Sequence, residues 1–137
     1  MNAFNDGTRV HIDAPVAAGN MFPFFPEPGK SWEPAKAASR VTRWSVDMAH
    51  LIGKTDVWQA DPNTTLQESC FIPRSETAAE GDGYVVQVAT RIDEMRTDVL
   101  LFEALRISAG PFATIRLPLR LRPGYHGNWA SRAQIGA

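Results

Sequence analysis

The prediction of the fold class starts from residues 80–90, EGDGYVVQVAT. The glycines of Glu80-Gly81-Asp82-Gly83 predict a tight turn, because glycine accepts the positive φ angles that such turns need. Residues 84–90 are apolar on both faces, as in a strand at the centre of a sheet. The polar loop 93–96 has the length of a hairpin connection, so residues 97–102 are predicted to return antiparallel to that strand.

Short strands separated by turns are predicted along the rest of the chain as well. The predicted strands are residues 8–13, 40–48, 55–59, 68–72, 84–90, 97–102 and 112–117. Helix is limited to short turns near 35–40 and 103–108. Ten Gly and ten Pro among 137 residues fit such a breaker-rich chain. The predicted fold class is all-β, as a sandwich, barrel or propeller, and residues 68–117 have the pattern of one four-stranded propeller blade.

The composition excludes several classes of protein. Fourteen basic and fifteen acidic residues give a net charge of -1, which offers no case for nucleic acid or an anionic membrane as partner. No apolar run approaches the roughly 20 residues that span a bilayer. The N-terminus has neither a basic start nor an apolar stretch, so no secretory signal is expected and a cytoplasmic location is predicted. The single cysteine, Cys70, excludes a disulfide framework and is expected to be a buried, inert thiol.

An apolar, aromatic segment interrupts the long connection between the first two predicted strands. Residues 21–26, MFPFFP, are too apolar for a free linker. We expect them to cover the core or a cavity wall, and an exposed patch for a partner chain is the alternative.

The three histidines are the first candidates for chemistry. None of His11, His50 and His126 forms a pair at the short spacing of common metal motifs. His11 in a strand and His50 before a turn are interpreted as structural residues. His126 lies between Gly124 and Gly127, so the backbone can bend closely around its imidazole. It is either a ligand or catalytic residue or an ordinary turn histidine.

Glu68 precedes an apolar strand and has two interpretations. It is either an exposed charge at a sheet edge or a buried acceptor that orients a metal-bound imidazole. Two other patterns give no site: the acidic turn 80–83 lacks the spacing of a calcium loop, and the arginines at 116, 120 and 122 lack interleaved aromatics.

Several strings, taken together and in order, resemble one family. They are NAF at 2–4, RWSVD at 43–47, LQESCFIPR at 66–74, EGDGYV at 80–85, LLFEA at 100–104, GP at 110–111, IRLP at 115–118 and GYHGNW at 124–129. This order resembles the C-terminal end of the carotenoid cleavage oxygenases, and most closely their bacterial lignostilbene dioxygenase branch. The resemblance covers most of residues 1–130.

The resemblance implies a fold, a cofactor and a reaction. It implies a seven-bladed β-propeller, of which residues 1–137 would form the C-terminal portion, about the last two blades. It implies Fe(II) held by four histidines, with glutamates orienting three of the imidazoles, and O₂ cleavage of a polyene or stilbene C=C bond to two carbonyls. By motif, His126 matches the last iron ligand and Glu68 matches an orienting glutamate.

The departures from the family pattern are also informative. The chain carries one of the four expected histidine ligands, and the third would lie just before the segment that begins at Met1. One interpretation is that Met1 is an internal methionine read as the start. A family Glu-Phe-Pro-Arg segment should follow residues 43–48, yet the chain passes directly to residues 49–54, which indicates an internal deletion near 49–50. His50 is then interpreted as a strand residue from the far side of that gap.

A single histidine ligand binds Fe(II) weakly, so this chain alone is expected to be inactive as a dioxygenase. The alternative from another class is a catalytically inactive, truncated propeller that complements another chain or self-associates through its open sheet edges. A truncated product that does not fold stably is a third interpretation.

Overall fold

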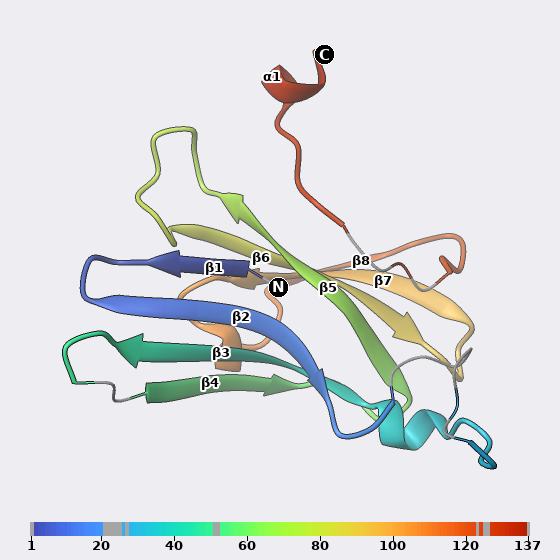
Figure 1. The fold of residues 1–137 in the computed structure, drawn as a ribbon. Coiled ribbons are helices and arrows are strands. Elements are labelled where there is room, and N and C mark those ends of the chain that lie inside the picture. The colour runs from blue at the N-terminus through green and yellow to red at the C-terminus, as the bar shows by residue number, and fades with distance from the viewer. Residues whose placement is uncertain are drawn as a thin grey trace.

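Two four-stranded antiparallel sheets make up the described part of the chain (Figure 1). The computed structural model describes residues 2–20, 26, 28–50, 53–122, 124 and 127–136, with Ala133 described by its backbone only. Sheet A contains, in order, β1 (Asn2–Asn5), β2 (Arg9–Ala17), β3 (Ser39–Asp47) and β4 (Gly53–Gln59). Sheet B contains β5 (Thr64–Pro73), β6 (Gly83–Arg91), β7 (Arg96–Glu103) and β8 (Ala113–Arg116). The all-β, antiparallel prediction is confirmed.

Helix is limited to three short segments among the described residues. They are the 3₁₀ turns η1 (Pro34–Ala37) and η2 (Ile107–Ala109) and the single-turn helix α1 (Arg132–Ile135). The turn predicted at 35–40 is shorter than expected because Ser39 already begins β3. Figure 1 shows α1, which the sequence did not predict, standing away from the sheets. None of the described helices is long and apolar enough to cross a membrane.

Most predicted strands are present, but their ends differ. The strands predicted at 40–48, 84–90 and 97–102 agree with β3, β6 and β7 to within a residue or two. β2 continues to Ala17 because its ladder with β3 runs from Arg9↔Asp47 to Ala17↔Ser39. Gly53 and the residue after it, predicted as a turn, belong to β4. β1 was not predicted, since a four-residue edge strand depends on its pairing with β2.

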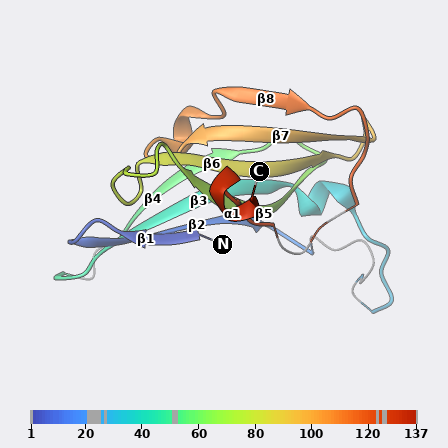
Figure 2. The same cartoon turned by 90° about the horizontal axis from the view of Figure 1, so that it is seen from above.

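The core lies between the facing sides of the two sheets, which Figure 2 shows from above. Its fully buried members are Val41, Ala60, Leu66, Val85, Ala89, Leu100, Phe102, Ala104 and Ile107. Phe102 of β7 meets Trp58 of β4 edge to face, with ring centroids 5.1 Å apart. The aromatic contact and the buried apolar side chains therefore hold sheet B against sheet A.

A second contact between the sheets is built around Phe4. Its ring stacks on His11 at 4.7 Å between centroids and on Phe71 of sheet B at 6.3 Å. The Arg43 guanidinium lies over the Phe4 ring, 5.1 Å from the centroid. Arg43 is itself paired with the fully buried Asp13, through Nε–Oδ1 and Nη2–Oδ2 contacts of 2.7 Å each.

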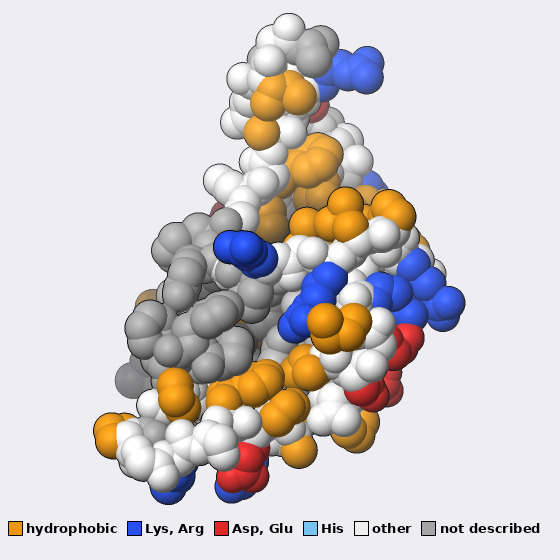
Figure 3. Space-filling model, turned by 90° about the vertical axis from the view of Figure 1, so that its right-hand side faces the viewer, with side chains coloured by type: hydrophobic (Ala, Val, Ile, Leu, Met, Phe, Trp, Pro, Cys, Tyr) orange, Lys and Arg blue, Asp and Glu red, His pale blue; other side chains and the backbone are white. Residues whose placement is uncertain are grey.

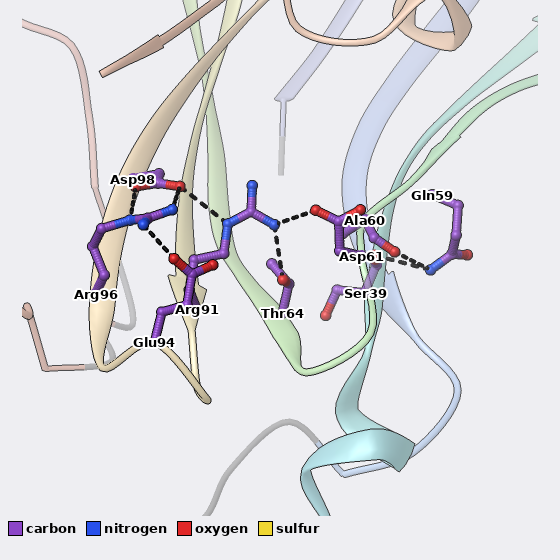
Figure 4. A network of polar contacts seen from close by, with 9 residues as sticks. All are labelled: Ser39, Gln59, Ala60, Asp61, Thr64, Arg91, Glu94, Arg96 and Asp98. Carbon is purple, nitrogen blue, oxygen red and sulfur yellow. Dashed lines mark hydrogen bonds and ion pairs between the residues drawn. The ribbon is translucent and has the colours of Figure 1, made fainter. Parts of the chain in front are cut away.

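A polar network fixes the β6–β7 hairpin to the connection between the sheets (Figure 4). Arg91 donates from Nε to Asp98 Oδ2 at 3.0 Å, and from Nη1 to Asp61 Oδ2 at 2.8 Å and Thr64 Oγ1 at 2.9 Å. Arg96 donates from Nε to Asp98 Oδ1 at 2.8 Å. The Asp98 side chain is only 1% exposed, so two guanidinium groups compensate its buried charge.

Candidate functional site

A bulge in β5 places the Glu68 side chain. The register between β5 and β6 shifts between Leu66 and Ser69, so Gln67 and Glu68 together face one residue of β6. Successive side chains of a regular strand point to opposite faces, whereas a bulge adds a residue and re-aims its side chains. The bulge therefore allows two consecutive β5 side chains to reach the same neighbouring segment.

The described residues of that neighbouring segment are Gly124 and Gly127. Gly124 donates its backbone N–H to Gln67 Oε1 at 3.1 Å, and Gly127 donates to Glu68 Oε2 at 3.4 Å. Glu68 is half-buried, between the exposed charge and the buried acceptor that the sequence left open. The two glycines bracket position 126, so the bulge holds the backbone on either side of that histidine.

An open cleft of about 600 Å³ lies beside this contact. Its lining residues are Asn2, Glu68, Ser69, Cys70, Phe71, Gly127 and Asn128. Cys70 is half-buried rather than buried, because the alternation of β5 turns it toward the cleft; its Sγ lies 3.7 Å from Asn128 Oδ1. The expectation of a buried thiol is corrected to this extent.

The histidines have different outcomes. His11 is a hydrogen-bonded structural residue, as expected: its Nδ1 lies 2.7 Å from Ser45 Oγ and its Nε2 lies 3.1 Å from Asp6 Oδ2. His50 is exposed in the turn after β3, with Nδ1 3.2 Å from Asp47 Oδ1. The expectation that His50 belongs to a strand is wrong, because its backbone closes the turn on the Asp47 carboxylate. His126 and residues 21–25 lie outside the described residues.

The described residues do not supply a ligand set for a metal. Within them no three His, Cys, Asp or Glu side chains come together in a group that could hold a metal ion. Glu68 is a carboxylate of the kind that accepts an N–H from a ligating imidazole.

Comparison with known proteins identifies the family. Residues 49–131 match the family described as RPE65, retinal pigment epithelial membrane protein. The chain belongs to this RPE65/carotenoid oxygenase family. Within the family, it is 28% identical over 200 residues to lignostilbene-alpha,beta-dioxygenase isozyme III of Sphingomonas paucimobilis, an alignment that covers 98% of this chain and 41% of the relative. It is 45% identical over 85 residues to resveratrol cleavage oxygenase 1 of Chaetomium globosum, covering 62% of this chain and 14% of that protein.

Solved structures of family members agree with this assignment. The crystal structure of Pseudomonas brassicacearum lignostilbene dioxygenase superposes with a TM-score of 0.54 at 26% identity, covering 94% of this chain and 40% of that one. Cobalt-substituted Synechocystis ACO shares the fold, with a TM-score of 0.54 at 17% identity over 94% of this chain and 38% of that one. This carotenoid oxygenase family chain thus spans about two fifths of the length of the two lignostilbene dioxygenases and of Synechocystis ACO.

Sequence reasoning missed two residues of the site, Gln67 and Gln87. Gln87 is fully buried, and its Oε1 accepts from Ser69 Oγ at 2.6 Å. A signal for it was present: one amide in the middle of an otherwise apolar central strand. Buried polar side chains are nearly always hydrogen-bonded, so such a residue indicates a place where backbone groups lack partners in the regular ladder.

Proposed function

We propose that this chain is the C-terminal part, about the last two blades, of a propeller-type non-haem Fe(II) dioxygenase. His126 supplies one of the four histidine ligands to the iron, and Glu68 orients that imidazole. The observation that carries the proposal is the β5 bulge, which brings the half-buried Glu68 carboxylate to the backbone at Gly127. Four histidine ligands would leave open positions on Fe(II) for O₂, and a carboxylate that accepts one ring N–H would fix the tautomer of its imidazole.

The names of several relatives support a proposal for the substrate class. Relatives of this chain include proteins named lignostilbene dioxygenase, resveratrol cleavage oxygenase and carotenoid cleavage oxygenase. We propose that the whole enzyme cleaves the C=C bond of a stilbene or a carotenoid-type polyene into two carbonyl products. The cytoplasmic location stays a prediction.

An internal deletion near 49–50 is part of the proposal. An alignment of 200 positions with the lignostilbene relative is longer than this 137-residue chain, so part of that relative has no counterpart here. The family match begins at residue 49, at the point where the sequence pattern is interrupted. The first finding supports a missing block, and the second supports its position near residues 49–50.

Expressed alone, residues 1–137 are expected to give no stilbene cleavage above the enzyme-free background. One histidine ligand binds Fe(II) too weakly to compete with water and chelators. The assay adds Fe(II) under argon, then a stilbene and O₂, and follows both carbonyl products. His126→Ala is the matched control. Product formed by the native chain and lost in His126→Ala contradicts the expected inactivity.

A second candidate function, a truncated propeller that self-associates, rests on the outward faces of the two sheets. Residues that alternate with the core point outward and are mostly apolar: Val10, Ile12, Trp44, Val46 and Val57 on sheet A, and Val86, Val88, Val99, Leu101 and Ile115 on sheet B. Trp44 is 36% exposed and Ile115 is 53% exposed. Figure 3, a view toward the ends of the strands, shows that hydrophobic side chains are exposed on that side of the molecule as well. Such faces are typical of surfaces that bind another chain.

The self-association candidate predicts a concentration-dependent oligomer in size-exclusion chromatography with light scattering. Trp44→Lys combined with Ile115→Lys places a charge on each outward face and is expected to weaken association by about tenfold or more. Ile135→Lys on α1, where the native side chain is 64% exposed and away from the sheets, is the control. A native chain that stays monomeric at high micromolar concentration excludes this candidate.

A further inference from the structure

Gln87 is a fully buried polar side chain at the centre of sheet B. Its Nε2 donates to the backbone carbonyl of Gln67, and its Oε1 accepts from Ser69 Oγ at 2.6 Å. A buried amide without partners costs free energy, whereas here both ends of the amide are satisfied. Both partners belong to β5, on the two sides of Glu68.

The position of these partners coincides with the β5 bulge. A bulge leaves its extra residue outside the regular ladder, so its backbone groups need other partners. Gln87 supplies one such partner, because its Nε2 donates to the backbone carbonyl of Gln67. Its Oε1 accepts from Ser69 Oγ and so fixes the residue at which the regular pairing resumes. The amide therefore bridges the irregular part of β5 from the neighbouring strand.

The bulge in turn sets the contacts with Gly124 and Gly127. Gln67 Oε1 and Glu68 Oε2 accept from Gly124 and Gly127, and a regular strand would point these side chains to opposite faces. We propose that Gln87 is a positioning residue: by fixing the β5 bulge, it makes Gln67 and Glu68 hold Gly124 and Gly127, which lie on either side of His126 in the sequence. The inference rests on the proposed function, because it assigns a support to that site.

A purely structural role for Gln87 gives a different expectation. If the amide only fills the core, its loss weakens sheet B as a whole and has no special effect on the 124–128 segment. If it positions the bulge, its loss loosens that segment first, while the β6–β7 ladder stays closed. The experiment therefore compares local opening with opening of the sheet.

Cys70, the single cysteine of the chain, gives a probe of local opening. The Cys70 side chain is half-buried in the cleft, and its Sγ contacts Asn128. Its rate of reaction with an aromatic disulfide therefore reports how often the contact between β5 and Asn128 opens. Gln87→Met keeps the side-chain length and removes both hydrogen bonds. We expect Cys70 labelling about tenfold faster in Gln87→Met than in the native full chain.

Thr90→Val is the matched control. Thr90 is a buried residue of the same strand, and its hydroxyl has no hydrogen-bond partner among the described residues, so the substitution removes no bond. Its labelling rate should stay within about twofold of the native rate. Amide exchange at Leu100, in the buried centre of β7, measures opening of the sheet in both variants.

Three outcomes overturn the positioning role: unchanged labelling in Gln87→Met, equal increases in both variants, or equal increases in Cys70 labelling and Leu100 exchange. A second measurement tests the route. In a Gln67→Met background, which removes the contact with Gly124, the effect of Gln87→Met should shrink, since both act on one segment. These measurements use neither iron nor O₂, so their failure and a failure of the iron proposal are distinguishable.

Discussion

Asp13→Asn is expected to lower the free energy of unfolding by about 3–5 kcal/mol, because it leaves a buried guanidinium without its counter-charge. Asp13 is fully buried and Arg43 is 4% exposed, and they share two hydrogen bonds of 2.7 Å. The asparagine amide would present N–H groups to a donor-only guanidinium. Urea unfolding followed by Trp fluorescence measures the change.

Two further variants test this explanation. The double variant Asp13→Leu with Arg43→Leu leaves no buried charge at this pair, so much of the lost stability should return. The contact of Arg43 with the Phe4 ring is lost in this variant. Glu33→Gln removes the ion pair of Glu33 with Lys36, whose side chains are 54% and 69% exposed. It should lower the free energy of unfolding by less than about 1 kcal/mol. Equal losses in Asp13→Asn and Glu33→Gln would show that burial of the pair has no special effect.

The strands that the sequence predicted well are those whose pattern is local. Residues 84–90 and 97–102 form β6 and β7, because the hairpin loop and the apolar runs define each other. The start of β5 at Thr64 was not predictable because it depends on pairing with Arg91, and the bulge at Gln67 was not predictable because it depends on Gln87 across the ladder. β1 depends in the same way on its ladder with β2.

The site was predicted through family resemblance more than through local chemistry. Residue spacing left Glu68 with two interpretations, and only the bulge, together with the 124–127 segment 56 or more residues away, brings its carboxylate to a backbone N–H. The aromatic contact of Phe4 with His11 and Phe71 likewise joins three strands from separate parts of the chain. Contacts of this kind arise from the packing of two sheets, which periodicity along one strand does not describe.

Asp98→Asn is expected to cost about 3 kcal/mol, the second large effect. Asp98 is buried on β7 and accepts from both Arg91 and Arg96, so the neutral amide would leave two guanidinium groups without a shared carboxylate (Figure 4). Glu94→Gln is the control: Glu94 also pairs with Arg96, but its side chain is 53% exposed, so its loss should cost less than about 1 kcal/mol.

The effect of Asp98 should also depend on pH. Burial raises the pKa of its carboxyl group, but hydrogen bonds from Arg96 and Arg91 and their charges outweigh burial and hold this pKa below the ordinary value of 3.8. A carboxyl whose pKa is lowered by folding stabilises the native state above its unfolded pKa, and this contribution is lost as pH falls toward the folded pKa. The difference in unfolding free energy between the native chain and Asp98→Asn should therefore be constant from about pH 7 to 5 and shrink below about pH 4. A difference that grows on acidification would show that the two arginines do not hold Asp98 ionised.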